Sequence, residues 1–169
     1  MLIRTESFAD EDSLRALHLE AFGGPEEAEL VDRLRRNEGL TRSLVAEAEG
    51  RVVGHIAFSK VIVTNEDGQV FEGVGLGPMA VAKVHQRSGI GSLLVRESIA
   101  RLKQSREAFC VVLGHPTYYP RFGFTRASEA GIRWEHDAPG DAFMVLALVP
   151  NGLAGVTGVV RYRPEFDGL

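Results

Sequence analysis

The sequence has few of the features that mark secreted, membrane-spanning or nucleic-acid-binding proteins. It contains one cysteine, Cys110, in 169 residues, so it cannot form an internal disulfide or supply a cysteine-rich metal site. No apolar run reaches the roughly 18 residues of a membrane-spanning helix, and the amino terminus lacks the pattern of a signal peptide. The net charge is -4 and no basic block exceeds two residues. We therefore expect a cytoplasmic protein that binds neither membranes nor nucleic acid.

The composition favours one globular domain over residues 1–169. Hydrophobic residues make up 44% and charged residues 25%, which are ordinary proportions, and a chain of this length can bury one sizeable core. No low-complexity linker or internal repeat divides the chain. The five histidines have no metal-binding spacing, so we predict no metal.

Three segments show the helical period of apolar residues. The first runs from about residue 14 to Gly23, the second from Pro25 to near Gly39, and the third starts around Gly89. Strand patterns occur between and after them, and the segment 117–121 predicts one helical turn. The expected strands, besides one near the amino terminus, are 44–48, 52–63, 70–81 with an interruption by glycines and Pro78, 108–113, 132–134, 143–149 and 156–162. This order predicts an α/β (α+β) fold, a mixed and mostly antiparallel sheet flanked by helices.

The strongest functional signal is Gln86-Arg87-Ser88-Gly89-Ile90-Gly91-Ser92, between a predicted strand and a predicted helix. Glycine lets the backbone approach a ligand closely, and a helix amino terminus offers N–H groups and partial positive charge to an anion. Arg87 adds a full charge. From the residues alone, the segment is either a phosphate site or a helix start eased by glycine.

An upstream segment, 75–80, fits the G-x-G-x-x-A spacing of dinucleotide-binding proteins. That fingerprint opens a helix, whereas Pro78 here precedes a strand pattern, so we reject a dinucleotide site. A nucleotide-binding protein that uses the later glycine loop remains a rival, although no phosphate-loop lysine is present.

Two motifs together make the chain resemble the GNAT N-acetyltransferase superfamily. Residues 86–91 match its acetyl-CoA signature, Q/R-x-x-G-x-G/A, and Tyr119 stands four residues before the pair Gly123-Phe124. The resemblance covers about residues 1 to 149, and the stretch 113–124 is similar to bacterial predicted acetyltransferases of the YhbS type. It implies the GNAT acyl-CoA N-acyltransferase fold and transfer of an acetyl group from acetyl-CoA to a primary amine of a small molecule or a protein.

The resemblance also implies how acetyl-CoA is held. The backbone of Met79, Ala80 and Val81 would pair with the pantetheine amides, and the acetyl group would lie where the fourth and fifth strands separate. The pyrophosphate would be bound by Gln86, Arg87, Ser88, Gly89, Ile90, Gly91 and Ser92. Lys83 is a departure, because many members have proline there.

Tyr119 is the expected general acid. A thioester expels a thiolate whose pKa is roughly 8.5, and a phenol with a pKa near 10 is protonated at neutral pH and can supply the proton. The amine must also lose a proton. We prefer His115 as the base because it is close to Tyr119 in sequence, with His55, Glu72 and His85 as other candidates.

Several points stay open at the level of the sequence. Cys110 lies in an apolar run, so we expect a buried thiol and direct transfer in a ternary complex without a covalent intermediate. Trp134, Phe143 and Tyr162 line an acceptor pocket, pack in the core or form a subunit contact. A non-catalytic acyl-CoA sensor, a longer acyl donor and homodimerisation through the carboxy-terminal strands are alternatives that the residues do not decide.

Overall fold

The structure, a computed structural model, describes all residues from 1 to 169. Its chain forms two compact units: unit 1 comprises Met1–Ser59, Gly77–Ile99 and Pro164–Leu169, and unit 2 comprises Lys60–Leu76 and Ala100–Arg163. The strands are β1 (Leu2–Thr5), β2 (Leu40–Ala48), β3 (Arg51–Thr64), β4 (Val70–Val81), β5 (Phe109–Leu113), β6 (Thr125–Arg126), β7 (Ile132–Trp134), β8 (Phe143–Ala147) and β9 (Gly158–Arg161). The helices are α1 (Glu11–Phe22), α2 (Glu26–Arg36) and α3 (Ile90–Gln104), with short 3-10 turns η1 (Phe8–Asp10), η2 (Lys83–His85), η3 (Tyr119–Phe122), η4 (Ala127–Ala130) and η5 (Pro164–Phe166).

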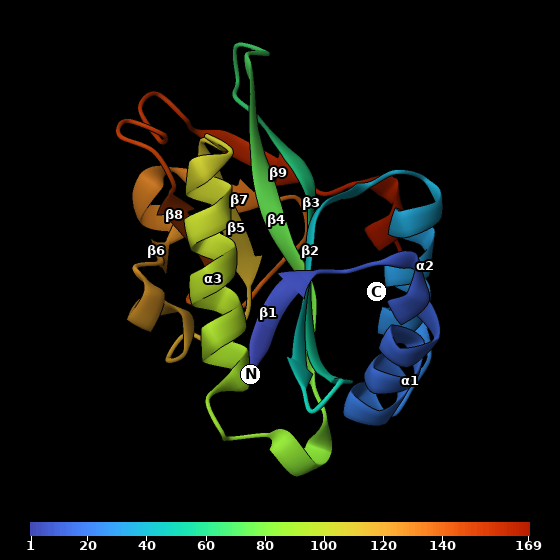
Figure 1. Ribbon diagram of the computed structural model, residues 1–169. Helices are drawn as coiled ribbons and strands as arrows, with labels where there is room; N and C mark the ends of the chain where they lie inside the picture. The colour runs from blue at the N-terminus through green and yellow to red at the C-terminus, as the bar shows by residue number, and fades with distance from the viewer. The chain divides into compact units, whose positions relative to one another are not determined.

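In unit 1, helices cover both faces of a group of strands. β1 pairs with β2 and β2 pairs with β3, both antiparallel. α1 and α2 lie side by side on one face of these strands, and α3 begins on the other face (Figure 1). Leu14 and Leu17 of α1 pack on Val45 of β2 and Ala80 of β4. Gly23 ends α1 in the left-handed conformation, with φ 79°, which is why the helix stops there.

Unit 2 is built around β5. All five residues of β5 pair antiparallel with β8, whereas β4 pairs parallel with β5 at Val74 and Gly75 only. β9 joins the end of β3 antiparallel and β7 parallel. The core of this unit includes Phe109, Val111 and Val145, all no more than 1% exposed. Cys110 and Val112, on the opposite face of β5, are also no more than 1% exposed, so the strand is buried on both faces up to Leu113, as expected.

The fold class predicted from the sequence is confirmed. Strand pairs are mostly antiparallel, and only β4 with β5 and β7 with β9 run parallel. The expected interruption of the strand at 73–78 is wrong, because β4 is continuous from Val70 to Val81. The predicted helical turn is a 3-10 turn at Tyr119–Phe122, β6 has no counterpart among the predictions, and β8 and β9 are shorter than expected. No helix has the length and apolar character required to cross a bilayer.

Candidate functional site

The segment that follows β4 in unit 1 forms an exposed loop, which we call the cofactor loop (residues 82–92). The Ala82 N–H donates to the Val53 carbonyl at 2.9 Å, which fixes the start of the loop on β3. Gln86 Nε2 reaches back to the Val81 carbonyl at 3.1 Å, and the Ser88 hydroxyl donates to the His85 carbonyl. These internal bonds hold the loop in shape while residues 86–89 stay exposed to solvent.

The backbone of the cofactor loop is suited to close approach by an anion. Arg87 and Gly89 both have positive φ, at 61° and 90°, and a side chain built on Gly89 would meet no atom within 4 Å. The first hydrogen bond of α3 runs from Leu93 N–H to the Gly89 carbonyl at 3.0 Å. The N–H groups of Gly89, Ile90 and Gly91 therefore have no partner within the helix, and they lie beside the charge of Arg87.

Tyr119 lies in unit 2, in the turn η3 that follows β5. Its backbone N–H and that of Tyr118 point at the His115 carbonyl, at 3.5 and 3.0 Å. A side chain on Gly114 would come within 2.3 Å of the Tyr119 ring, so glycine makes the space for that ring. Tyr118 and Phe124 contact the ring edge to face, with centroids 5.1 and 5.7 Å away.

The surroundings of Tyr119 control its protonation. The residue is only 6% exposed. Burial, followed by the neighbouring Tyr118 and Cys110, raises the pKa of the phenol well above its usual value near 10. The hydroxyl is thus protonated at neutral pH, which is the state that a proton donor requires.

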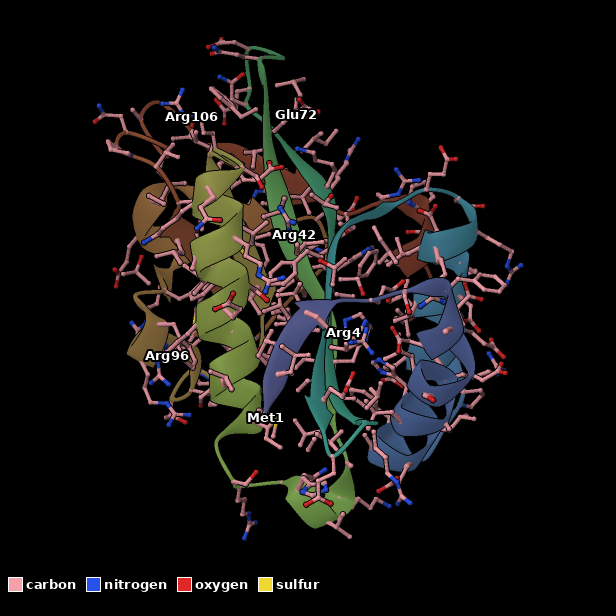
Figure 2. The ribbon with its side chains drawn as sticks, viewed as in Figure 1. Met1, Arg4, Arg42, Glu72, Arg96 and Arg106 are labelled. Carbon is pink, nitrogen blue, oxygen red and sulfur yellow. The ribbon has the colours of Figure 1, made fainter.

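The four candidate bases have different environments. The His115 side chain is exposed and has no polar partner. Glu72 is exposed on the part of β4 that belongs to unit 2 (Figure 2), and His85 lies half-buried in η2. His55 is fully buried and hydrogen-bonded within unit 1.

A buried polar cluster in unit 1 was not predicted from the sequence. His18 Nε2 and His55 Nδ1 are 2.8 Å apart, and both residues are 0% exposed. His55 Nε2 is 2.7 Å from Ser43 Oγ and 3.3 Å from Glu6 Oε2, and the Ser43 hydroxyl donates to the same Glu6 oxygen. The signal in the sequence was the polar His18 four residues after Leu14 on the apolar face of α1.

Burial is the main reason why the two histidines of this cluster are neutral. Arg35 Nε donates to Glu6 Oε1 at 2.9 Å, and hydrogen bonds from His55, Arg35 and Ser43 outweigh burial and lower the pKa of Glu6 to about 2. Burial, with the adjoining His55 and Arg35, lowers the pKa of His18 to about 3. Burial likewise lowers the pKa of His55.

A second buried carboxylate of unit 1, Asp10, lies in η1 and is bound by an arginine of the strand β1. Arg4 donates to both oxygens of Asp10 at 2.7 and 2.8 Å and to Glu47 at 2.9 Å. The Arg4 bond is the main cause that lowers the pKa of Asp10. This ion pair joins β1, η1 and β2, and thus fixes the entry to α1.

The remaining sequence candidates belong to the core of unit 2. Cys110 is 0% exposed, and burial raises the pKa of its thiol, so the thiolate required of a nucleophile is disfavoured. Trp134, Phe143 and Tyr162 all pack in the core around Phe109, which favours the core interpretation of these aromatics. No three metal-ligating side chains gather in one place.

Fold and motifs agree with the comparison to known families. The family described as Acetyltransferase (GNAT) domain matches residues 3–127. The chain belongs to this family and is an acetyltransferase of the GNAT type.

Particular relatives match over nearly the whole chain. An uncharacterized N-acetyltransferase of Escherichia coli strain K12, YhbS, is 39% identical over 168 residues, covering 99% of each chain. The crystal structure of YhbS with CoA has a TM-score of 0.90 at 37% identity and covers 98% of this chain and 91% of that one. A GNAT acetyltransferase of Brucella melitensis in complex with acetyl-CoA has a TM-score of 0.80 at 37% identity, covering 98% and 97%. The resemblance inferred from the two motifs is thereby confirmed.

Proposed function

We propose that this protein transfers the acetyl group of acetyl-CoA directly to a primary amine in a ternary complex. The observation that carries the proposal is the cofactor loop, in which N–H groups without a helical partner lie at the start of α3 beside the exposed residues Arg87 and Gly89. The complexes of the two relatives with CoA and acetyl-CoA support the same ligand here. Arg87, Ser88, Gly89, Ile90, Gly91 and Ser92 would bind the pyrophosphate, with Gln86 holding the loop.

The backbone of Met79, Ala80 and Val81 would bind the pantetheine amides. β4 uses only two of its 12 residues to pair with β5, and these lie at Val74 and Gly75, before this segment. The strand edge of residues 79–81 would therefore supply N–H and carbonyl groups to the ligand in place of a neighbouring strand.

Tyr119 would protonate the departing thiolate, and His115 would take the proton of the amine. An alkylamine with a pKa near 10.4 is mostly protonated at pH 7, and freeing its lone pair costs roughly 4–5 kcal/mol. An exposed histidine at the end of β5 can accept that proton and release it to solvent. The burial of Cys110 supports transfer without an acetylated cysteine.

Replacement of the Tyr119 hydroxyl tests the proposal. With acetyl-CoA and a panel of primary amines, Tyr119→Phe should lower thiol release by about 10²–10⁴-fold, because general acid catalysis contributes that much. Binding of acetyl-CoA, measured by calorimetry, should change little. Tyr118→Phe is the matched control, since it removes a hydroxyl from the residue next to Tyr119. The phenylalanine ring would still lie under Arg121, and thiol release should change little.

The alternatives give different results in the same experiment. A non-catalytic sensor would bind acetyl-CoA and release no thiol with any amine, and a longer acyl donor would be preferred over acetyl-CoA in both assays. Stabilisation of the wild-type protein by ATP or NAD, and by no acyl-CoA, would overturn the assignment of the cofactor loop. The single domain over 1–169, the cytoplasmic location, a homodimer and the choice between small-molecule and protein amines stay predictions.

A further inference from the structure

Helix α1 is bonded to the cofactor loop through a side chain. Glu20 Oε1 of α1 accepts a hydrogen bond from the backbone N–H of Lys83 at 2.9 Å. Lys83 is the first residue of η2, the turn that leads into the pyrophosphate-binding segment. A proline at this position would have no N–H and could not make the bond, so the departure from the family pattern at Lys83 has a structural consequence.

The same helix is fixed to the sheet by the buried histidine pair. The Ser43 hydroxyl gives its only proton to Glu6, so His55 Nε2 must be the donor to Ser43. In neutral His55 the other nitrogen, Nδ1, is then an acceptor, and His18 Nε2 donates to it at 2.8 Å. This bond ties α1 to β3, and both partners are excluded from solvent.

The point of attachment lies directly beside the start of the cofactor loop. The bond from Ala82 N–H to the Val53 carbonyl fixes the residue after β4 on β3, the strand that carries His55. Leu14 and Leu17 of α1 pack on Ala80, and Ala82 packs against the same cluster. The helix α1, the end of β4 and the start of the cofactor loop are therefore packed against one another.

We propose that α1 is a clamp on the cofactor loop, in which Glu20 holds the Lys83 backbone and the His18–His55 pair holds the helix that carries Glu20. The inference rests on the proposed function, because it concerns the affinity for acetyl-CoA. Glu20, His18 and His55 are positioning residues, which act on the ligand through the loop. The bond requires a lone pair on His55 Nδ1, so His55 must be neutral for it to form.

Four exposed-site variants test the clamp through the affinity for acetyl-CoA. Glu20→Ala removes the acceptor and Lys83→Pro removes the donor, and each should raise the Kd and the KM for acetyl-CoA about 3–10-fold, as expected for one net hydrogen bond. Glu20→Gln keeps an acceptor oxygen and Lys83→Ala keeps the N–H, so both should stay within about twofold of the wild type. The kcat should stay within about twofold in all four, since none touches the reacting atoms.

Further controls separate positioning from general loss of structure. Proline fits at position 83 because Ala82 already has the extended ψ of 135° that a residue before proline prefers. Asp12→Ala changes an exposed acid of α1 that has no partner, and it should leave the Kd unchanged. His18→Leu should weaken acetyl-CoA binding in the wild-type background. Its effect should be smaller in Glu20→Ala, because His18 acts on the ligand through the Glu20–Lys83 bond, which that variant has already lost.

The outcomes are distinguishable from failure of the proposed function. If the wild type does not bind acetyl-CoA, the assignment of the cofactor loop fails. If the wild type binds and Glu20→Ala and Lys83→Pro bind equally well, the clamp is overturned while the function stands. Equal weakening by Glu20→Gln and Glu20→Ala would also overturn it, since an accepting oxygen would then not be what holds the loop.

Discussion

At the scale of single residues, the glycines of β4 leave space for aromatic rings. A Cβ on Gly75 would lie 2.4 Å from the Tyr162 ring and 2.7 Å from Val61, and a Cβ on Gly73 would lie 2.3 Å from the Phe109 ring. The first glycine of the G-x-G spacing that imitates a dinucleotide site, Gly75, thus has a packing cause. We expect Gly75→Ala to lower the free energy of unfolding by about 1–3 kcal/mol, measured in urea, because overpacking forces neighbours from their rotamers.

The matched control lies on the same strand. At Gly77 the nearest atoms to a new Cβ, the Ala57 carbonyl oxygen and Phe166, are at 3.4 Å, which is ordinary contact. Gly77→Ala should therefore cost less than about 1 kcal/mol. If both variants lost the same stability, the space taken by the Tyr162 ring would not be the reason for glycine at position 75.

At the scale of elements, sequence periodicity was sufficient wherever the pattern was local. α1 and α2 were predictable from apolar stripes bounded by Gly23 and Pro25, and β5 from its unbroken apolar run. The cofactor loop and the Tyr119 turn are contiguous motifs, so they could be found as well. His18 and His55 are 37 residues apart and meet only because α1 packs on β3, so periodicity alone could not pair them. The continuity of β4 was missed because its glycines serve distant side chains rather than a bulge.

The last element of the chain returns to unit 1 and supports α2. Arg33 Nη2 donates to the Glu165 carbonyl at 2.9 Å, and Asn37 Nδ2 donates to the Glu165 carboxylate at 3.0 Å. Glu165 is 8% exposed, so its removal would leave these donors without their acceptor. Deletion of residues 164–169 should lower the free energy of unfolding by about 2–4 kcal/mol, seen as an earlier urea midpoint.

A shorter deletion is the control for the carboxy-terminal element. Residues 168 and 169 are exposed, and removing them alone should change stability by less than about 0.5 kcal/mol. If the protein without residues 164–169 unfolded at the same urea concentration as the wild type, the contacts of η5 with α2 would contribute nothing to stability.

At the scale of the whole molecule, the buried histidine pair makes stability depend on pH. The folded protein lowers the pKa of His18 to about 3 and lowers that of His55 as well, whereas the unfolded chain binds protons with a pKa near 6.5. The unfolded state therefore takes up more protons as the pH falls below about 6.5, and the folded state loses stability. Glu6 and Asp10 also have lowered pKa values, but their stabilising effect is lost only below about pH 4.5.

The window between pH 6.5 and 4.5 consequently reports on the histidine pair. We expect a free energy of unfolding that is flat above about pH 7 and then falls by up to about 2.7 kcal/mol per pH unit, which corresponds to two protons at 1.36 kcal/mol each. Urea titrations at a series of pH values measure this slope. His18→Gln should halve it, whereas His136→Asn should leave it unchanged because that side chain is exposed. A wild-type stability that stays constant down to pH 5 would mean that the pair takes up protons in the folded protein with the same pKa as in the unfolded chain, and the pair would then not stay neutral below about pH 6.5.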